Sequence, residues 1–299
     1  MTGRVVVVGS ANLDHTAQVD RLPLPGETIV ASDLRSSPGG KGANQAVASS
    51  RAGGAHTTFI GAVGNNDAGT QLVAALTAAS VQVLVSRADR KPTGSASIVV
   101  DGRGENTIVV SPGANELAEG SDIRAKQAIR DAAVIIGQLE IPISATLNAF
   151  RSRSSGALAI LNAVPASQDA WSLLRDTDVL VVNETEALSV SGAAAVADAV
   201  AFLCEKVPVV VVTLGERGSL IARTGQPPTT VPALTIDAID TTAAGDTFCG
   251  VLAAELAVSA SVEGAVHRAT VAAALAATRR GSQESIPTRG AVQMAADNR

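Results

Sequence analysis

Short apolar runs rich in valine and isoleucine recur along the chain, mostly separated by alanine-rich segments of helical period. Continuous apolar runs of this length are typical of strands that are covered on both faces. The pattern predicts strands at residues 4–9, 57–61, 81–86, 133–139, 157–162, 179–183 and 209–214. We therefore expect an α/β protein with three layers, α/β/α, in which helices cover both faces of a central, mostly parallel sheet.

Two regions, residues 15–37 and 94–111, break this alternation and predict antiparallel excursions from the sheet. In the second, β-branched runs at 96–100 and 107–110 flank a glycine-rich connector, which suits a tight hairpin turn. Together the two regions predict a small strand lid. We find no linker rich in Gly, Ser or Pro between two long halves, so we expect one domain over residues 1–299 that carries this lid.

Composition narrows the range of partners. The 23 Lys and Arg residues are outnumbered by 28 Asp and Glu, giving a net charge of −5, so nucleic acid is not expected as a partner. The apolar stretch 262–278 is too short and too polar to span a bilayer, and we expect no membrane association. The chain enters its first predicted strand within a few residues of Met1 and holds only two cysteines, far apart, which favours a cytoplasmic protein.

One glycine-containing segment, residues 240–248, precedes an apolar run of helical character and is predicted to form a helix N-terminus. Free backbone N–H groups and the helix dipole make such an end an anion site, and Ala244 and Gly245 are small enough for a phosphate to approach. Asp246 would then lie beside the bound anion. The alternative is that Asp246 simply caps its own helix or places a favourable negative charge in its first turn.

A second segment, residues 37–46, is also rich in glycine and opens another predicted helix, with Lys41 and Asn44 about one turn apart. Both side chains can face one ligand. The alternative is a glycine turn that starts a helix and leaves Lys41 in solvent. The spacing is not that of a P-loop, and the first strand lacks the glycine pattern of a dinucleotide fold.

Polar residues follow several predicted strands, at the sheet edge where open α/β proteins bind ligands. Asn12 and Asp14 follow the first strand and suit hydrogen bonding to vicinal hydroxyls, although an Asx turn is equally compatible. Glu140 ends the run at 133–139 and is ambiguous between a solvated and a ligand-facing position. Residues 183–186 (Asn-Glu-Thr-Glu) and 213–218 follow two further strands, with helix capping and a plain hairpin turn as the respective alternatives.

Taken together, and in the same order along the chain, these segments resemble the ribokinase-like (PfkB) family of carbohydrate and nucleoside kinases over nearly the whole sequence. The resemblance rests on residues 9–14, 25–28, 39–46, 113–115, 138–140, 183–187, 213–215 and 240–248. It implies a ribokinase-like fold and an ATP-dependent sugar kinase. Asp246 would be the catalytic base, and the N–H groups of Ala244, Gly245 and Asp246 would form an anion hole.

The resemblance also implies a set of binding residues. Those that would contact the sugar are Asn12, Asp14, Gly40, Lys41, Asn44, Glu140 and Asp246. Those that would line the nucleotide site are Asn183, Thr213, Gly215, Gly218 and Gly245, with Thr270 replacing a histidine that better-known members carry near the adenine. Glu186 would organise Mg²⁺ through water, and the positions matching a K⁺ (monovalent cation) site are Asp240, Thr242, Ala276, Arg279, Gly281 and Ser285.

Asn12 with Asp14 and the full 39–46 string resemble the ribose-specific members of the family, which implies D-ribose as the acceptor, phosphorylated on its 5-hydroxyl to give D-ribose 5-phosphate and ADP. Two alternatives stay open: a kinase of the same family for another sugar or nucleoside, such as deoxyribose, fructose or adenosine, and a sugar-binding sensor without catalysis. We further expect the lid to close over the sugar and exclude water, and its exposed strands to pair two copies into a homodimer.

Overall fold

The computed structural model describes residues 3–119 and 122–297. Nine strands form the main sheet in the order β13-β12-β11-β10-β9-β8-β1-β4-β5. Those from β11 to β5 in this order run parallel, and β12 and β13 add an antiparallel edge. The strands are β1 (Arg4–Val8), β4 (His56–Gly64), β5 (Gln82–Ala88), β8 (Val134–Gly137), β9 (Leu158–Asn162), β10 (Val179–Asn183), β11 (Val209–Thr213), β12 (Ser219–Ala222) and β13 (Thr229–Val231).

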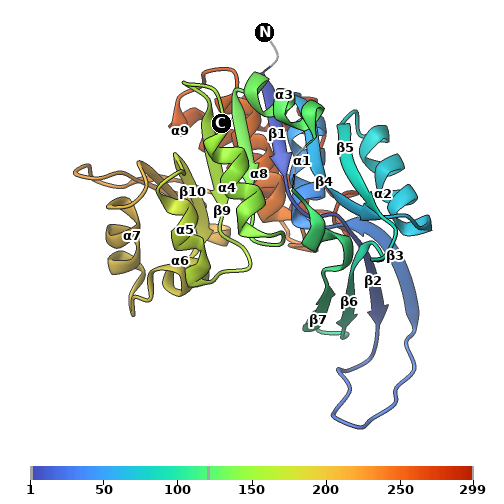
Figure 1. Ribbon diagram of the computed structural model, residues 1–299. Coiled ribbons are helices and arrows are strands. Elements are labelled where there is room, and N and C mark those ends of the chain that lie inside the picture. Colours follow the sequence, from blue (N-terminus) through green and yellow to red (C-terminus); the bar gives the residue numbers. More distant parts are fainter. Residues whose placement is uncertain (1–2, 120–121, 298–299) are drawn as a thin grey trace.

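Helices cover both faces of this sheet, which confirms the predicted three layers (Figure 1). One face packs against α1 (Lys41–Arg51), α2 (Asp67–Ala78), α8 (Ala244–Leu256), α9 (Val262–Ala277) and α10 (Arg289–Asp297). The other packs against α3 (Ile123–Asp131), α4 (Ile143–Arg151), α5 (Trp171–Leu174), α6 (Glu184–Ser191) and α7 (Val196–Cys204). Three short 3₁₀ turns complete the fold: η1 (Gly113–Leu117), η2 (Gln168–Ala170) and η3 (Gly215–Arg217).

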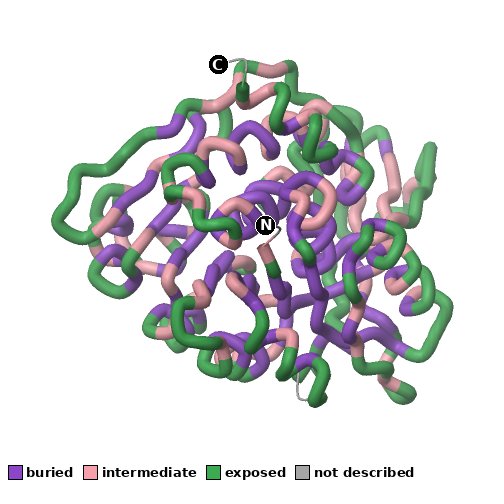
Figure 2. The backbone as a smooth tube through the Cα atoms, turned by 90° about the horizontal axis from the view of Figure 1, so that it is seen from above, coloured by how far each residue is buried: buried purple, intermediate pink, exposed green. Residues whose placement is uncertain are grey.

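The run of four valines in β1 shows why this sequence forms a central strand. Val5 and Val7 lie in the core on the α1 and α8 side, whereas Val6 and Val8 lie in the core on the α4 side. Because side chains alternate between the faces of a strand, only an unbroken apolar run can fill both cores. Figure 2 shows the result: residues along the central strands and helices are mostly buried, and exposed residues lie mostly around the rim.

The small sheet, defined as β3-β2-β6-β7, projects from the main body at the end away from the N-terminus (Figure 1). Its strands are β2 (Asn12–Gln18), β3 (Asp33–Gly39), β6 (Gly94–Val100) and β7 (Asn106–Ser111). The predicted antiparallel pairings hold within each excursion, but β2 and β6 pair in parallel. The sequence made no prediction for the pairing of β2 with β6; the two strands are parallel because each continues from the carboxyl end of a parallel strand of the main sheet.

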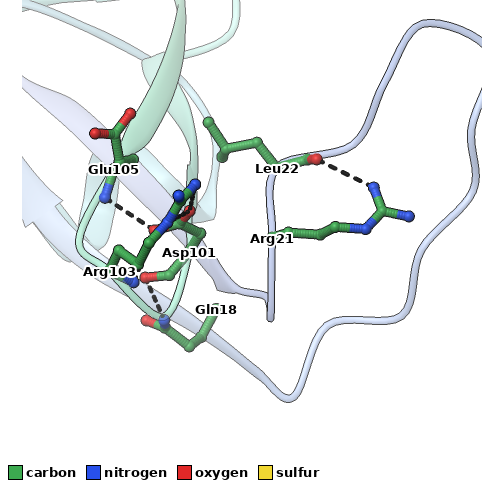
Figure 3. Close-up of polar contacts among 6 residues, drawn as sticks. All are labelled: Gln18, Arg21, Leu22, Asp101, Arg103 and Glu105. Atoms are coloured by element: carbon green, nitrogen blue, oxygen red, sulfur yellow. Dashed lines mark hydrogen bonds and ion pairs between the residues drawn. The ribbon is translucent and has the colours of Figure 1, made fainter.

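The turn between β6 and β7 is held by one buried carboxylate (Figure 3). Asp101 Oδ1 accepts hydrogen bonds from the backbone N–H groups of Arg103 (2.8 Å) and Glu105 (3.0 Å). The side chain of Gln18 donates to the carbonyl oxygen of Asp101 (3.1 Å), which ties the end of β2 to the same turn. The turn is thus fixed by side-chain contacts as well as by its glycines.

Within residues 3–119 and 122–297, no single helix has the length and apolar character needed to cross a membrane. Glu184–Ser191 and Val196–Cys204 pass that test only as a pair, and they are bent by 62° at the break between them.

Candidate active site

Asp246 lies in the first turn of α8 and is 8% exposed. The helix begins after Ala243, whose backbone is left-handed (φ 58°), and no side chain caps it. Asp246 instead accepts hydrogen bonds from two amides of α1: Asn44 Nδ2 to Oδ2 (3.1 Å) and Gln45 Nε2 to Oδ1 (3.0 Å). Asp246 therefore does not cap its helix, because both carboxylate oxygens are directed at α1, although it does place a negative charge in the first turn of α8.

The N-terminus of α1 is anchored from another segment of the chain. Glu140 Oε2 accepts from the backbone N–H of Lys41 (3.1 Å) and from Ser10 Oγ (2.5 Å). A carboxylate in this position satisfies a free N–H and favours the positive end of the helix dipole. Gly40, just before the helix, has φ 88°, and a Cβ there would lie 2.7 Å from the backbone N of Asn12. Glycine is therefore required where α1 meets β2.

Asp14, in β2, faces a strongly negative surrounding. Burial, followed by the charges of Glu140 and Asp246, raises its pKa to about 7, while Lys41 opposes the shift. A Cβ at Gly39 would lie 1.9 Å from Asp14 Oδ2, so the glycine leaves the room that this carboxylate occupies. Its buried Oδ1 has no hydrogen-bond partner within the described residues. An ionisable group with an unsatisfied buried oxygen beside other carboxylates is characteristic of ligand sites.

Lys41 is the cation among these carboxylates. Burial lowers its pKa, but the negative charges of Asp246, then Glu140 and Glu186, outweigh burial, so its pKa lies above the usual value. The ammonium group therefore stays charged near neutral pH. A fixed positive charge close to Asp246 suits the binding of an anionic group there.

Asn12 is buried at the start of β2 and is oriented by Asn115 of η1. Asn115 Nδ2 donates to Asn12 Oδ1 (2.7 Å), and Asn115 Oδ1 accepts from the N–H of Ala11 (3.0 Å). The residues expected on the sugar side thus come from β2, α1, α8 and the segment after β8. Asn12 and Asp14 lie within strand β2 and not in the Asx turn considered from the sequence. Glu140 binds the N-terminus of α1 and is not the solvated side chain of the other alternative.

The residues expected to line the nucleotide site lie after β10 and β11. Asn183 and Glu186 form a capping box: Asn183 Oδ1 accepts from the N–H of Glu186 (2.8 Å), and Glu186 Oε2 accepts from the N–H of Asn183 (2.8 Å). The capping alternative is thus present in the structure. Burial raises the pKa of Glu186, and the charges of Lys41 and Asp246 both act on it, so this carboxylate lies within electrostatic reach of Asp246.

Thr213 ends β11 opposite Asn183 in the register and leads through η3 into β12. Gly215 (φ 59°) and Gly218 (φ 92°) both adopt backbone conformations that favour glycine. The segment is the hairpin turn considered from the sequence. Behind it, Thr270 of α9 lies 3.1 Å from the hydroxyl of Ser219, oxygen to oxygen, and both residues are buried.

The residues matched to a monovalent cation come from the loop before α8 and from the C-terminal end of α9 with the loop that follows it. Asp240 joins them, because its Oδ1 accepts from the N–H of Thr242 (2.9 Å) and its Oδ2 from the N–H of Gly281 (3.0 Å). Burial raises the pKa of Asp240, but these hydrogen bonds outweigh burial and lower it overall. The N–H of Arg279 donates to the carbonyl of Ala276 (3.1 Å), and Ser285 is fully buried in the same loop.

Two features of the site differ from the sequence-based expectation or are absent from it. The N–H of Ala244, expected in an anion hole, donates to the carbonyl of Thr241 (3.2 Å). Of the three expected donors this leaves Gly245 and Asp246, for which we find no backbone acceptor among the described residues. The sequence also gave no role to Gln45, which binds Asp246 directly. The only available signal was its place in the 39–46 string next to Asn44.

Comparison with known proteins agrees with this geometry. Residues 2–289 match the model of the pfkB family of carbohydrate kinases. The chain is 38% identical, over 97% of its length, to the bifunctional ribokinase/ribose-5-phosphate isomerase A of Fructilactobacillus sanfranciscensis and spans 55% of that longer protein. It is 37% identical to the ribokinase of Staphylococcus aureus, over 96% of this chain and 97% of that one.

A solved structure gives the same picture of the fold. The ribokinase of Arabidopsis thaliana, in complex with ribose and ATP, superposes with a TM-score of 0.90 at 31% identity, covering 99% of both chains. The matched stretch includes both the main sheet and the small sheet. A phosphotransferase that acts on a carbohydrate and uses ATP with Mg²⁺ follows from the family match. The chain belongs to the pfkB family of carbohydrate kinases.

Proposed function

We propose that this kinase is a ribokinase, which transfers the γ-phosphoryl group of ATP to the 5-hydroxyl of D-ribose. The observation that carries the proposal is the buried Asp246 carboxylate, held by α1 in the first turn of α8, within electrostatic reach of both Asp14 and Lys41. The Staphylococcus aureus relative is a ribokinase, the Fructilactobacillus sanfranciscensis relative includes one, and the Arabidopsis ribokinase was solved with ribose and ATP.

The chemistry follows from these positions. The ribose O5 attacks the γ-phosphorus as Asp246 accepts its proton, and the bond to the leaving oxygen of ADP breaks. Charge on the transferring group is met by the N–H groups of Gly245 and Asp246 and by the positive end of the α8 dipole. Movement of Ala244 away from Thr241 would add a third donor to this anion hole.

Acceptor recognition falls to the polar groups on either side of α1. Ionised Asp14, with its unpaired Oδ1, accepts hydrogen bonds from sugar hydroxyls, and Asn12 and Asn44 lie nearby on β2 and α1. Lys41 and Glu140 complete the surface, and the backbone of Gly40, packed against β2, would contact the sugar between them. The small sheet closes over the bound sugar and excludes water, which suppresses hydrolysis of ATP.

The nucleotide lies along Asn183, Thr213, Gly215 and Gly218, with Thr270 behind the base. Mg²⁺, when bound, would supply charge that screens the phosphates, and Glu186 would hold it through water, because both Glu186 oxygens already accept hydrogen bonds from Asn183. Oxygen atoms around Asp240, mostly backbone carbonyls, would hold a monovalent cation such as K⁺. This set comprises Asp240, Thr242, Ala276, Arg279, Gly281 and Ser285.

The small sheet also supports a homodimer. Its edge strands β3 and β7 expose apolar side chains, including Leu34 (68% exposed) and Val109 (64% exposed). Exposed apolar edges of this kind pair readily with another copy of the same edge. Pairing two small sheets would cover both edges at once.

A substrate panel tests the proposal. ADP release is measured with D-ribose, deoxyribose, fructose and adenosine at equal concentrations, with and without K⁺. We expect the highest kcat/KM with D-ribose and stimulation by K⁺. A higher kcat/KM for any of the other three would assign the enzyme to that acceptor, and ATP turnover that no acceptor stimulates would contradict a sugar kinase.

A further inference from the structure

The carboxylate of Asp246 is the centre of a chain of buried amides. Its Oδ1 accepts from Gln45 Nε2 (3.0 Å), and Gln45 Oε1 in turn accepts from Gln138 Nε2 (2.6 Å). Its Oδ2 accepts from Asn44 Nδ2 (3.1 Å), and Asn44 Oδ1 accepts from Gln283 Nε2 (3.2 Å). Each carboxylate oxygen is therefore held by one amide, and each of these amides is fixed by a second.

These amides are well shielded from water. Gln45 and Gln138 are fully buried, and Asn44 and Gln283 are each 6% exposed. Gln45 Nε2 also donates to Asn162 Oδ1 (3.0 Å), so this amide cannot rotate without losing several bonds. Gly9 leaves the room for Gln138, since a Cβ there would lie 2.0 Å from Gln138 Oε1.

The four amides come from widely separated parts of the sequence. Asn44 and Gln45 belong to α1, Gln138 follows β8, and Gln283 lies in the loop after α9. Burying so many polar groups has a free-energy cost, and apolar side chains of the same shape often give an equally stable core. These amides are therefore not explained by stability alone. What apolar residues could not do is fix the orientation of a carboxylate.

From this arrangement we propose that Gln45, fixed by Gln138, is a positioning residue that holds Asp246 in the orientation needed for proton abstraction, and that Gln283 does the same through Asn44. The inference rests on the proposed role of Asp246 as the base. Gln45 touches neither substrate in this scheme, so its loss affects turnover rather than binding. A poorly oriented base lowers the rate because few bound complexes have reactive geometry.

The test measures kcat and KM for ribose and ATP in Gln45→Met, in Asp246→Asn and in the double variant. Methionine keeps the length of the side chain and removes the donor. One hydrogen bond to a charged group corresponds to roughly a tenfold change in rate, so we expect kcat to fall by about that factor while each KM stays within about twofold. In the Asp246→Asn background the same substitution is expected to change kcat by less than about twofold.

Two further variants separate positioning from stability. Thr57→Val removes a buried hydroxyl that binds Ser49 Oγ (3.0 Å) at the far end of α1, and we expect it to leave kcat unchanged. Gln283→Met probes the other arm even if Gln45→Met does not fold: it is expected to lower kcat and to leave the KM for ATP within about twofold, with any rise in KM confined to ribose, because Asn44 also faces the sugar. Thermal unfolding of each variant shows whether the protein is folded at the assay temperature.

The outcomes distinguish this inference from the proposed function. If Gln45→Met lowers kcat equally in both backgrounds, or raises KM at unchanged kcat, Gln45 does not act through Asp246 and the inference fails. If Asp246→Asn is strongly impaired while Gln45→Met and Gln283→Met turn over normally, the inference fails and the proposed base stands. If Asp246→Asn retains full turnover, both fail.

Discussion

Replacing Asp14 by asparagine is expected to stabilise the protein at neutral and alkaline pH. Burial, together with Glu140 and Asp246, raises the pKa of Asp14 from 3.8 to about 7. Because the folded state holds this proton more tightly than the unfolded state, the associated stability is fully present below pH 3.8 and is lost as the pH rises through about 7. Asparagine carries no charge at any of these pH values, so Asp14→Asn does not lose unfolding free energy in this way as the pH rises.

The magnitude follows from the shift in pKa. Each unit corresponds to about 1.4 kcal/mol, and roughly two units separate pH 5 from the raised pKa. The difference in unfolding free energy between Asp14→Asn and the wild type should therefore grow by up to about 3 kcal/mol between pH 5 and pH 8. Carboxylates shared by the two proteins cancel in this difference.

Urea denaturation of both proteins at pH 5, 6, 7 and 8 provides the measurement. Asp20→Asn, an exposed position shortly after the same strand β2, is the matched control and is expected to show no such trend. A difference that stays constant from pH 5 to pH 8, or an Asp14→Asn protein that is less stable than the wild type at pH 8, would refute the reasoning. Loss of ribose binding in Asp14→Asn would accompany the gain in stability, because the buried charge serves the ligand.

Three other substitutions test separate parts of the structure. Gly40→Ala is expected to lower the unfolding free energy by about 1–3 kcal/mol, because φ is 88° and a Cβ would meet the backbone of Asn12. The control Gly225→Ala also places alanine at a positive φ, but in open space, and should lower the unfolding free energy less. Equal losses in urea denaturation would argue against the close contact at Gly40. Asp240→Ala should abolish stimulation of turnover by KCl, and an unchanged response would exclude Asp240 from the cation site. Val109→Glu should shift the protein from dimer to monomer in sedimentation velocity, and a wild type that is already monomeric at micromolar concentration would contradict pairing through the small sheet.

The sequence predicted the main sheet well because each central strand must be apolar on both sides. The run at residues 179–183 coincides with β10, and the other predicted strands differ from the observed ones by a few residues at their ends. The edge strand β12 was predicted only as the second arm of an alternative hairpin, and β13 was not predicted. They are short, and β13 is exposed along most of its length, so its apolar pattern is weak. The small sheet also begins earlier than expected, at Asn12, because pairing with Gly39 and Gly94 extends β2 back to that residue.

Local sequence patterns identified the two glycine-containing helix N-termini that carry Lys41 and Asp246, because a run of small residues followed by an apolar helical segment can be recognised in the sequence. The partners of these residues could not be predicted in the same way. Gln283 lies 239 positions from Asn44 in the sequence, and Gln138 lies 93 positions from Gln45. Glutamine is common at surfaces, so only the fold reveals that these side chains meet at one carboxylate.

The role of Asp246 as the base that accepts the proton of the acceptor hydroxyl is tested most directly by the turnover of Asp246→Asn. General-base catalysis contributes about 10²–10⁴-fold, so kcat with ribose and ATP should fall by at least about that factor while circular dichroism and thermal unfolding show an intact fold. Turnover close to that of the wild type, in a folded Asp246→Asn protein, would contradict the account.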